Sequence, residues 1–440
     1  MLAEHDLLRH IEVLSCVSGG SIVGACYWMA LRNRLMQPEA MDRDAYVALL
    51  KELIDHFKSA VDANLRGETQ PGKLQAFWRL LNDSQGLLEP EDVAKILNRW
   101  FYQPLMAGRK DAPIFLDDLP FTPADHDPAL AGPGDFNPGK HNWLRQHKVP
   151  ALVLNATSVN TGHAWQFTTT WMGESPWSVH EATDSVARLE WAWYSDDASW
   201  RMELGRAVAA SACVPGVFNP LKIDGKYADE VLVQLVDGGV HDNQGTVSLL
   251  AMDCNILLVS DACGQLLFQK APQPGLKGLA SYVMRSMDVL MERVRNANFA
   301  DLQARKQSGQ LRALMFLHMK AGLEPEVVPR LTSQQPHTVR RGPIAPSGLR
   351  RDFQRALAEL RTDLNRFTDD EANALMACGY QMAKHAVQRD LSQHSQLAQP
   401  ARAAVWPFEE IRKEIASTAE TTARRAELLE AFEEGKRVRM

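Results

Sequence analysis

The chain has 440 residues, of which 45% are hydrophobic and 23% charged, and a formal net charge of −6. This length accommodates one large α/β domain with extensions, or two domains. The mildly acidic charge provides no global basic field, which argues against a nucleic-acid partner. Its six cysteines lack CxxC spacing, which excludes the common zinc and redox motifs, so we expect reduced thiols.

The N-terminal residues do not resemble a signal peptide. Acidic residues and histidines stand where a basic segment and an apolar run would be needed. The longest apolar stretch, around residues 22–31, is much shorter than a membrane span. These features predict a cytoplasmic or peripheral membrane location, with any lipid contact made from the surface.

Short apolar runs alternate with amphipathic helices through the first 260 residues. This alternation is typical of a parallel or mixed sheet with helices on both faces. The expected strands are residues 11–16, 151–156, 163–169, 232–236 and 255–260, and the expected helices are 19–31, 204–213 and 247–252, with a helix-rich stretch at 41–102.

The pattern becomes mainly helical after about residue 270. Residues 278–307 predict a long amphipathic helix with a methionine-rich stripe, which we expect to pack against the core. We therefore predict an α/β core in residues 1–270. A mainly helical region, residues 271–440, is expected to pack on it.

Ser18 lies between a short apolar run and a helix, in the sequence Cys16-Val-Ser-Gly-Gly. A strand, a tight turn and a helix in this order are typical of a nucleophile elbow. The backbone of such a serine is strained, and Gly19 and Gly20 are expected to leave the turn the room it needs. The helix N-terminus favours a developing negative charge, and the N–H of Gly19 is the candidate oxyanion donor.

Two other interpretations fit this stretch. An elbow centred on Ser21 would place Val23 where glycine is expected, so Ser21 is better interpreted as a first-turn cap or a supporting donor. On this stretch alone, Ser18 is equally compatible with an ordinary N-cap in a glycine-rich turn.

A second turn, Asp237-Gly-Gly, follows an apolar run that predicts a strand. A carboxylate at a strand end lies on the same rim of a sheet as an elbow serine, where it can accept the serine proton. An ordinary Asp-Gly turn is the simpler alternative. A Ser–His–Asp triad through His241 is conceivable, but we favour His241 as a rim residue, with Asp242 and Asn243 stabilising the turn.

Together these motifs resemble the patatin-like phospholipase family. The resemblance rests on residues 18–21 (SGGS), 154–162 (LNATSVNTG), 209–218 (AASACVPGVF) and 237–243 (DGGVHDN), which occur in the family's order and spacing. It implies a three-layer α/β/α fold that hydrolyses lipid esters, namely phospholipids, lysophospholipids or neutral acylglycerols. The expected partner is the lipid ester substrate, with possible peripheral contact with a membrane and no nucleic acid.

The resemblance also implies a Ser/Asp dyad without a catalytic histidine. Ser18 would be the nucleophile, and Asp237 the base that then protonates the leaving alcohol. Gly20, Gly238 and Gly239 would support the two turns. The resemblance implies neither a metal nor an organic cofactor, and the sequence does not indicate headgroup preference or oligomeric state.

One family feature is not found before Ser18. In the family, a glycine-rich loop after the first strand supplies most oxyanion donors, and residues 2–10 correspond to the end of the helix that follows it. Loss of a single oxyanion donor typically costs about 10²–10³ in rate. We therefore expect the chain starting at Met1 to be truncated, weakly active or inactive, and less stable than a form extended upstream. The alternative function is a lipid-binding or scaffold protein that retains the fold without the chemistry.

Overall fold

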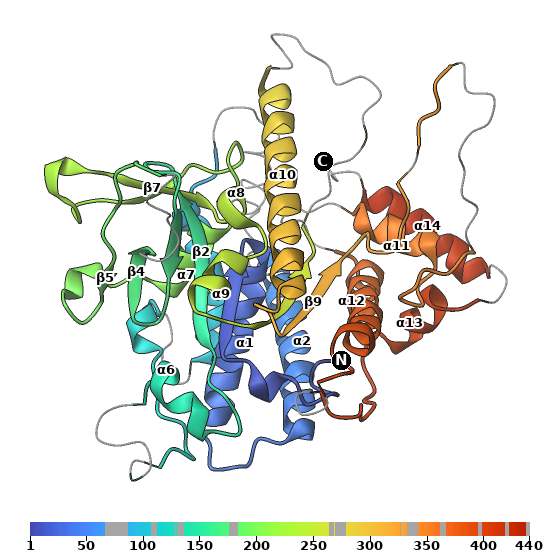
Figure 1. The fold of residues 1–440 in the computed structure, drawn as a ribbon, viewed down its shortest axis with the longest axis horizontal. Helices are drawn as coiled ribbons and strands as arrows, with labels where there is room; N and C mark the ends of the chain where they lie inside the picture. The colour runs from blue at the N-terminus through green and yellow to red at the C-terminus, as the bar shows by residue number, and fades with distance from the viewer. Residues whose placement is uncertain are drawn as a thin grey trace. The chain divides into compact units, whose positions relative to one another are not determined.

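The computed structural model describes residues 1–66, 87–106, 112–127, 129, 136–175, 184–263, 268, 279–325, 327–331, 342–360, 367–394, 398–418 and 422–436. The chain forms two compact units (Figure 1). The larger unit comprises Asp6–Leu257 and Lys270–Arg312, and the smaller comprises Met1–His5, Leu258–Gln269 and Ala313–Met440. The domain division at residue 270 stays a prediction.

The larger unit contains the strands and helices that surround Ser18 and Asp237. Its strands are β1 (Val13–Val17), β2 (Ala151–Ser158), β3 (Ala164–Phe167), β4 (Trp171–Glu174), β5 (Ala192–Trp193), β6 (Leu221–Ile223) and β7 (Val233–Asp237). Its α-helices are α1 (Gly19–Leu35), α2 (Arg43–Arg66), α4 (Pro90–Leu97), α6 (Pro138–His141), α7 (Leu204–Ser211), α8 (Gly239–Asp242), α9 (Thr246–Ala251) and α10 (Leu279–Gln307). A π-helical turn, η2 (Asn98–Tyr102), follows α4, and the 3-10 turns are η1 (Leu8–His10), η3 (Gln103–Leu105), η4 (Leu116–Asp118), η5 (Asn142–Leu144), η6 (Ala198–Trp200) and η7 (Ala228–Glu230).

The seven strands form one mixed sheet in the order β5-β4-β3-β2-β7-β6, with β1 paired to β2. The β1–β2 pair is parallel, and the other pairs are antiparallel. The predicted sheet is therefore confirmed as mixed, with antiparallel pairing predominant.

Strand β2 carries two other strands end to end along one edge. Its residues 154–157 pair with β3 on one side, so β1 and β7 must share the opposite side. Strand β1 runs parallel to β2 and ends with Val17 opposite Asn155. Strand β7 runs the other way and ends with Asp237 opposite Ala156. The C-terminal ends of β1 and β7 therefore meet head to head.

Helices cover both faces of this sheet. Because side chains alternate along a strand, Leu152, Leu154 and Ala156 of β2 face one side and enter the hydrophobic core. Helices α1, α4 and α7 contribute further residues to that core. Helices α8 and α9 contact β2 and β1, and α10 runs past α8 (Figure 1). The predicted α/β/α arrangement is confirmed.

Helix α10 does not bury its whole apolar stripe. Leu290 is 65% exposed and Tyr282 52% exposed, and Val283 and Val289 are exposed as well. Of the methionine-rich stripe, Leu290 is exposed while Met287, Met291 and Val294 are partly buried, so the expectation that the stripe packs on the core fails at Leu290.

The smaller unit is mainly helical, as predicted for the C-terminal region. It contains α11 (Arg351–Ala358), α12 (Asp369–Asp390), α13 (Glu409–Ile415) and α14 (Ala423–Gly435), and a two-stranded sheet pairs β8 (Ile256–Asp261) with β9 (Ala313–His318). Buried Glu4 accepts hydrogen bonds from the Tyr380 hydroxyl at 2.8 Å, the Trp406 indole N–H at 2.8 Å and the Ala404 N–H at 2.9 Å. These contacts fix the first residues of the chain within this unit.

The head-to-head packing leaves no room for a side chain at Gly238. A Cβ atom there would lie 2.3 Å from the backbone oxygen of Asn155. We expect Gly238→Ala to destabilise the protein by about 3 kcal/mol, because β2 or the turn must shift. Thermal unfolding followed by circular dichroism measures the effect. Gly20→Ala is the matched control and should cost less than about 1 kcal/mol, since no atom lies within 4 Å of a Cβ there. Equal midpoints for the two variants would contradict the packing argument.

Candidate active site

Ser18 occupies the turn between β1 and α1 in a backbone conformation that is rare for residues with a side chain. Its φ is 52° and its ψ is −131°. Such a conformation costs on the order of 1–3 kcal/mol and persists only where the surroundings enforce it. The N–H of Ser18 donates to the backbone oxygen of Ser211 at 3.1 Å and to its hydroxyl at 3.0 Å. The end of α7 thus helps to hold the strained residue.

The glycines after Ser18 do not relieve crowding, contrary to the sequence-based expectation. No atom lies within 4 Å of a Cβ built on Gly19 or Gly20, and both residues are exposed at the start of α1. The close contact is one turn further on, where a Cβ at Gly24 would lie 2.3 Å from the sulfur of Cys16. Gly24 therefore lets Cys16 stand where an elbow usually has glycine.

Asp237 ends β7 with its side chain buried, 3% exposed. Its Oδ1 accepts the N–H of Gly239 at 2.7 Å, its N–H donates to the oxygen of Cys213 at 2.8 Å, and its backbone oxygen accepts the hydroxyl of Thr157 at 2.9 Å. Burial raises the pKa of the carboxyl to about 6, although hydrogen bonds from Ser18 and Gly239 act to lower it. The carboxyl is thus a stronger base than an exposed aspartate.

The two predicted site residues are in contact. The Ser18 hydroxyl interacts with the Asp237 carboxyl closely enough to lower its pKa. Oδ2 of Asp237 is nevertheless buried, and among the described residues no donor meets full hydrogen-bond geometry with it. The carboxyl therefore retains a lone pair on Oδ2 that can accept a proton.

A polar network supports the sheet below the two turns. Asn155 donates from its side chain to the hydroxyl of Ser15 and to the backbone oxygen of Cys16, each at 2.9 Å. Its Oδ1 accepts the hydroxyl of Ser248 at 2.5 Å, and Ser248 in turn accepts from Gln166 at 2.6 Å. No role for Asn155 was predicted, because its side-chain partners come from two distant segments, β1 and α9.

Asp242 stabilises the second turn, as expected. Its carboxyl accepts the N–H groups of Gln244 at 3.0 Å and Val247 at 2.8 Å, and the amide of Asn298 on α10 at 3.0 Å. Burial lowers the pKa of His241. Its Nδ1 is buried, with no hydrogen-bond partner among the described residues. This geometry gives no support to a triad through His241.

The comparisons with known proteins agree with this arrangement. A family model described as patatin-like phospholipase matches residues 1–250, more than half of the chain and the segment that contains both Ser18 and Asp237. The chain belongs to the patatin-like phospholipase family. No curated protein matches it.

Membership places the chain among lipid acyl hydrolases. Each helix in the described part of this patatin-like chain is too short or too polar to cross a bilayer. Within the same residues, His, Cys, Asp and Glu do not gather in groups of three or more that could hold a metal ion.

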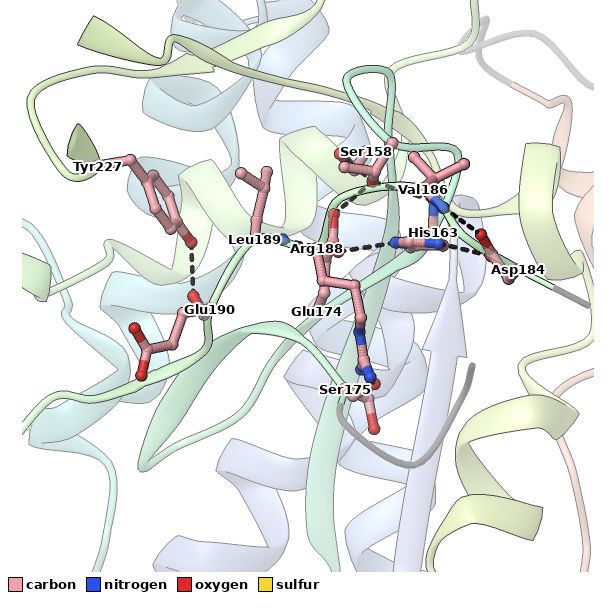
Figure 2. Close-up of polar contacts among 11 residues, drawn as sticks. Ser158, His163, Glu174, Ser175, Asp184, Val186, Arg188, Leu189, Glu190 and Tyr227 are labelled. Atoms are coloured by element: carbon pink, nitrogen blue, oxygen red, sulfur yellow. Dashed lines mark hydrogen bonds and ion pairs between the residues drawn. The ribbon is translucent and has the colours of Figure 1, made fainter. Parts of the chain in front are cut away.

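A second buried polar cluster of the patatin-like domain lies beyond the end of β2. The ring of His163 lies between two carboxylates, with Nδ1 2.8 Å from Oε2 of Glu174 and Nε2 2.7 Å from Oδ2 of Asp184 (Figure 2). Thr161 donates to the same glutamate, and so does the N–H of Leu189 at 3.0 Å. The cluster thereby attaches residues 184–190 to the sheet.

His163 is not a suitable catalytic base. Both ring nitrogens face carboxylates, so the ring is best accommodated as an imidazolium that donates to both. Burial acts to lower the pKa of His163, but the hydrogen bonds and charges of Glu174 and Asp184 outweigh it and raise the pKa. Neither nitrogen remains to accept a serine proton, which indicates a structural role.

The raised pKa predicts a definite pH dependence of stability. The stabilisation from protonated His163 is fully present below about pH 6.5, the unfolded-state pKa, and is lost as the pH rises through the higher folded-state pKa. His163→Gln should therefore lower the thermal midpoint most at acidic pH, with the difference from the wild type shrinking at alkaline pH.

The control for this prediction is His147→Gln. Burial lowers the pKa of the half-buried His147, so this variant should show the opposite trend. Differential scanning fluorimetry between pH 5 and 9 measures both variants. A pH-independent difference for His163→Gln would contradict the imidazolium assignment.

Proposed function

We propose that this patatin-like protein is a serine lipid acyl hydrolase that works through an acyl-enzyme on Ser18. The proposal rests on one observation above all, the contact between the Ser18 hydroxyl and a buried carboxyl whose pKa is raised to about 6. A general base with a pKa near the working pH is matched to proton abstraction.

In the acylation step, Ser18 Oγ attacks the ester carbonyl while its proton passes to Asp237. The carbonyl oxygen becomes an oxyanion, and in this proposal the N–H of Gly19 at the start of α1 donates to it. Collapse of the tetrahedral intermediate breaks the bond to the alcohol, and Asp237 returns the proton to this leaving group. In deacylation, water attacks the acyl-enzyme and loses its proton to Asp237, which then protonates Ser18 as the acid is released.

The proposed substrates are carboxylic esters of lipids, of the phospholipid, lysophospholipid or neutral acylglycerol class. The open space around Gly19 and Gly20 supports this assignment, because an ester must approach Ser18 from the exposed side of the turn. Peripheral contact with a membrane remains a prediction, for which the exposed apolar side chains of α10, including Leu290, offer a surface.

The buried state of Asp237 also argues against a role confined to lipid binding or scaffolding. A buried carboxyl with a raised pKa destabilises the folded protein at neutral pH. A protein without hydrolytic chemistry would gain stability from asparagine at this position, whereas a hydrolase needs the base.

Covalent labelling with a fluorophosphonate tests the proposal. The wild type should acquire the label on Ser18, located by mass spectrometry of peptides, and the labelling rate should rise as the pH passes through about 6. Ser18→Ala should remove the label completely. Asp237→Asn should slow labelling by about 10²-fold or more, because the base is lost.

Ser21→Ala is the control for reaction at the neighbouring serine, and its label should remain on Ser18. Label that persists in Ser18→Ala, or a wild type that gains no label over a prolonged incubation, would overturn the nucleophile assignment.

A further inference from the structure

We infer that Ser211 is a positioning residue that holds the nucleophile turn and the base turn in register. This inference rests on the proposed function, since it concerns the placement of Ser18 relative to Asp237. Ser211 is the last residue of α7 and is completely buried.

The hydroxyl of Ser211 joins three segments. It donates to the backbone oxygen of Asn155 on β2 at 2.6 Å. Its single proton is used there, so it must accept the bonds from the N–H of Ser18 at 3.0 Å and from the hydroxyl of Ser21 at 2.8 Å. The hydroxyl therefore connects both ends of the first turn of α1 to the central strand.

The backbone oxygen of Ser211 joins the two turns directly. It accepts the N–H of Ser18 at 3.1 Å and the N–H of Gly238 at 3.3 Å. Carbonyl groups at a helix C-terminus lack partners within the helix, and here two such partners come from the residues beside the nucleophile and the base. One residue thus sets the position of both turns relative to β2.

The consequence concerns the strained backbone of Ser18. Its positive φ occurs together with an N–H directed at both the backbone oxygen and the hydroxyl of Ser211, and such a conformation persists only where the surroundings enforce it. Without the hydroxyl, Ser18 retains only the bond to the backbone oxygen, and the hydroxyl of Ser21 loses its acceptor inside the protein. We expect the Ser18 hydroxyl to move away from Asp237, and misplacement on the order of 1 Å costs as much as 10²-fold in rate.

The test is fluorophosphonate labelling of Ser211→Ala, analysed for the rate constant at saturating probe, the apparent probe affinity and the final extent of labelling. The rate constant should fall by about 10-fold or more, with the apparent affinity nearly unchanged. The final extent of labelling, which counts folded molecules, should remain close to that of the wild type. A role confined to stability would instead reduce the extent and leave the rate constant of the folded fraction unaltered.

Ser158→Ala is the matched control. Ser158 is the last residue of β2, is also completely buried, and its hydroxyl forms a hydrogen bond with the Thr161 hydroxyl at 2.9 Å. Its removal deletes an equivalent buried hydroxyl away from the turns, so the labelling rate constant should stay within about 2-fold of the wild type.

Two further results complete the test. If Ser211→Ala does not fold, Ser21→Ala removes one of the three bonds to the hydroxyl and should slow labelling in the same direction by a smaller factor. If the wild type labels on Ser18 but Ser211→Ala, or Ser21→Ala in its place, labels equally fast, the positioning role is wrong and the proposed function stands. Failure of the wild type to label on Ser18 would instead remove the proposed function.

Discussion

The meeting of two strand ends on one edge of β2 determines the rest of this structure. Strand β1 reaches Asn155 from one direction, and β7 reaches Ala156 from the other. Neither strand can continue along this edge of β2, because the other strand blocks it. Both segments must therefore leave the sheet at the same point. A serine and an aspartate occupy the two points of departure, and backbone pairing therefore brings together side chains 219 positions apart in the sequence.

This arrangement lowers the stability of the folded state, and the destabilising features lie in the site itself. Ser18 adopts a positive φ, and raising the pKa of Asp237 from 3.8 to about 6 costs the folded state on the order of 3 kcal/mol at neutral pH. Because the pKa is raised, the carboxyl destabilises the folded state at pH values above its folded-state pKa. It has no such effect at pH values below its unfolded-state pKa. The apolar core between the sheet and α1, α4 and α7 stabilises the fold enough to retain both features.

The sequence predicted those parts of the site that depend on local pattern. A strand followed by Ser-Gly-Gly and a helix, and a strand followed by Asp-Gly-Gly, are local signals, and the structure brings both residues together. The prediction that Gly19 and Gly20 relieve crowding in the turn was wrong, because the side on which a turn is crowded depends on which element packs behind it. Here the crowded position is Gly24, against Cys16.

Ser211 and His163 were not predicted because their roles depend on tertiary contacts. A serine at the end of an alanine-rich helix has no distinctive pattern until β2 and the first turn of α1 pack around it. His163 similarly gains significance only when Glu174 and Asp184 approach its two nitrogens. The strand alternation did predict an α/β sheet with helices on both faces, but the predominance of antiparallel pairs depends on connections that residue pattern does not encode.

The most direct measurement of the central claim is the pKa of Asp237 in the presence and absence of the Ser18 hydroxyl. Carbon-13 NMR of aspartate-labelled protein, with the resonance assigned by its loss in Asp237→Asn, provides this value. We predict a midpoint near pH 6 in the wild type and a higher one in Ser18→Ala, because the hydrogen bond from Ser18 lowers the pKa. A midpoint near pH 4, or the same midpoint in both proteins, would contradict the contact on which the account depends.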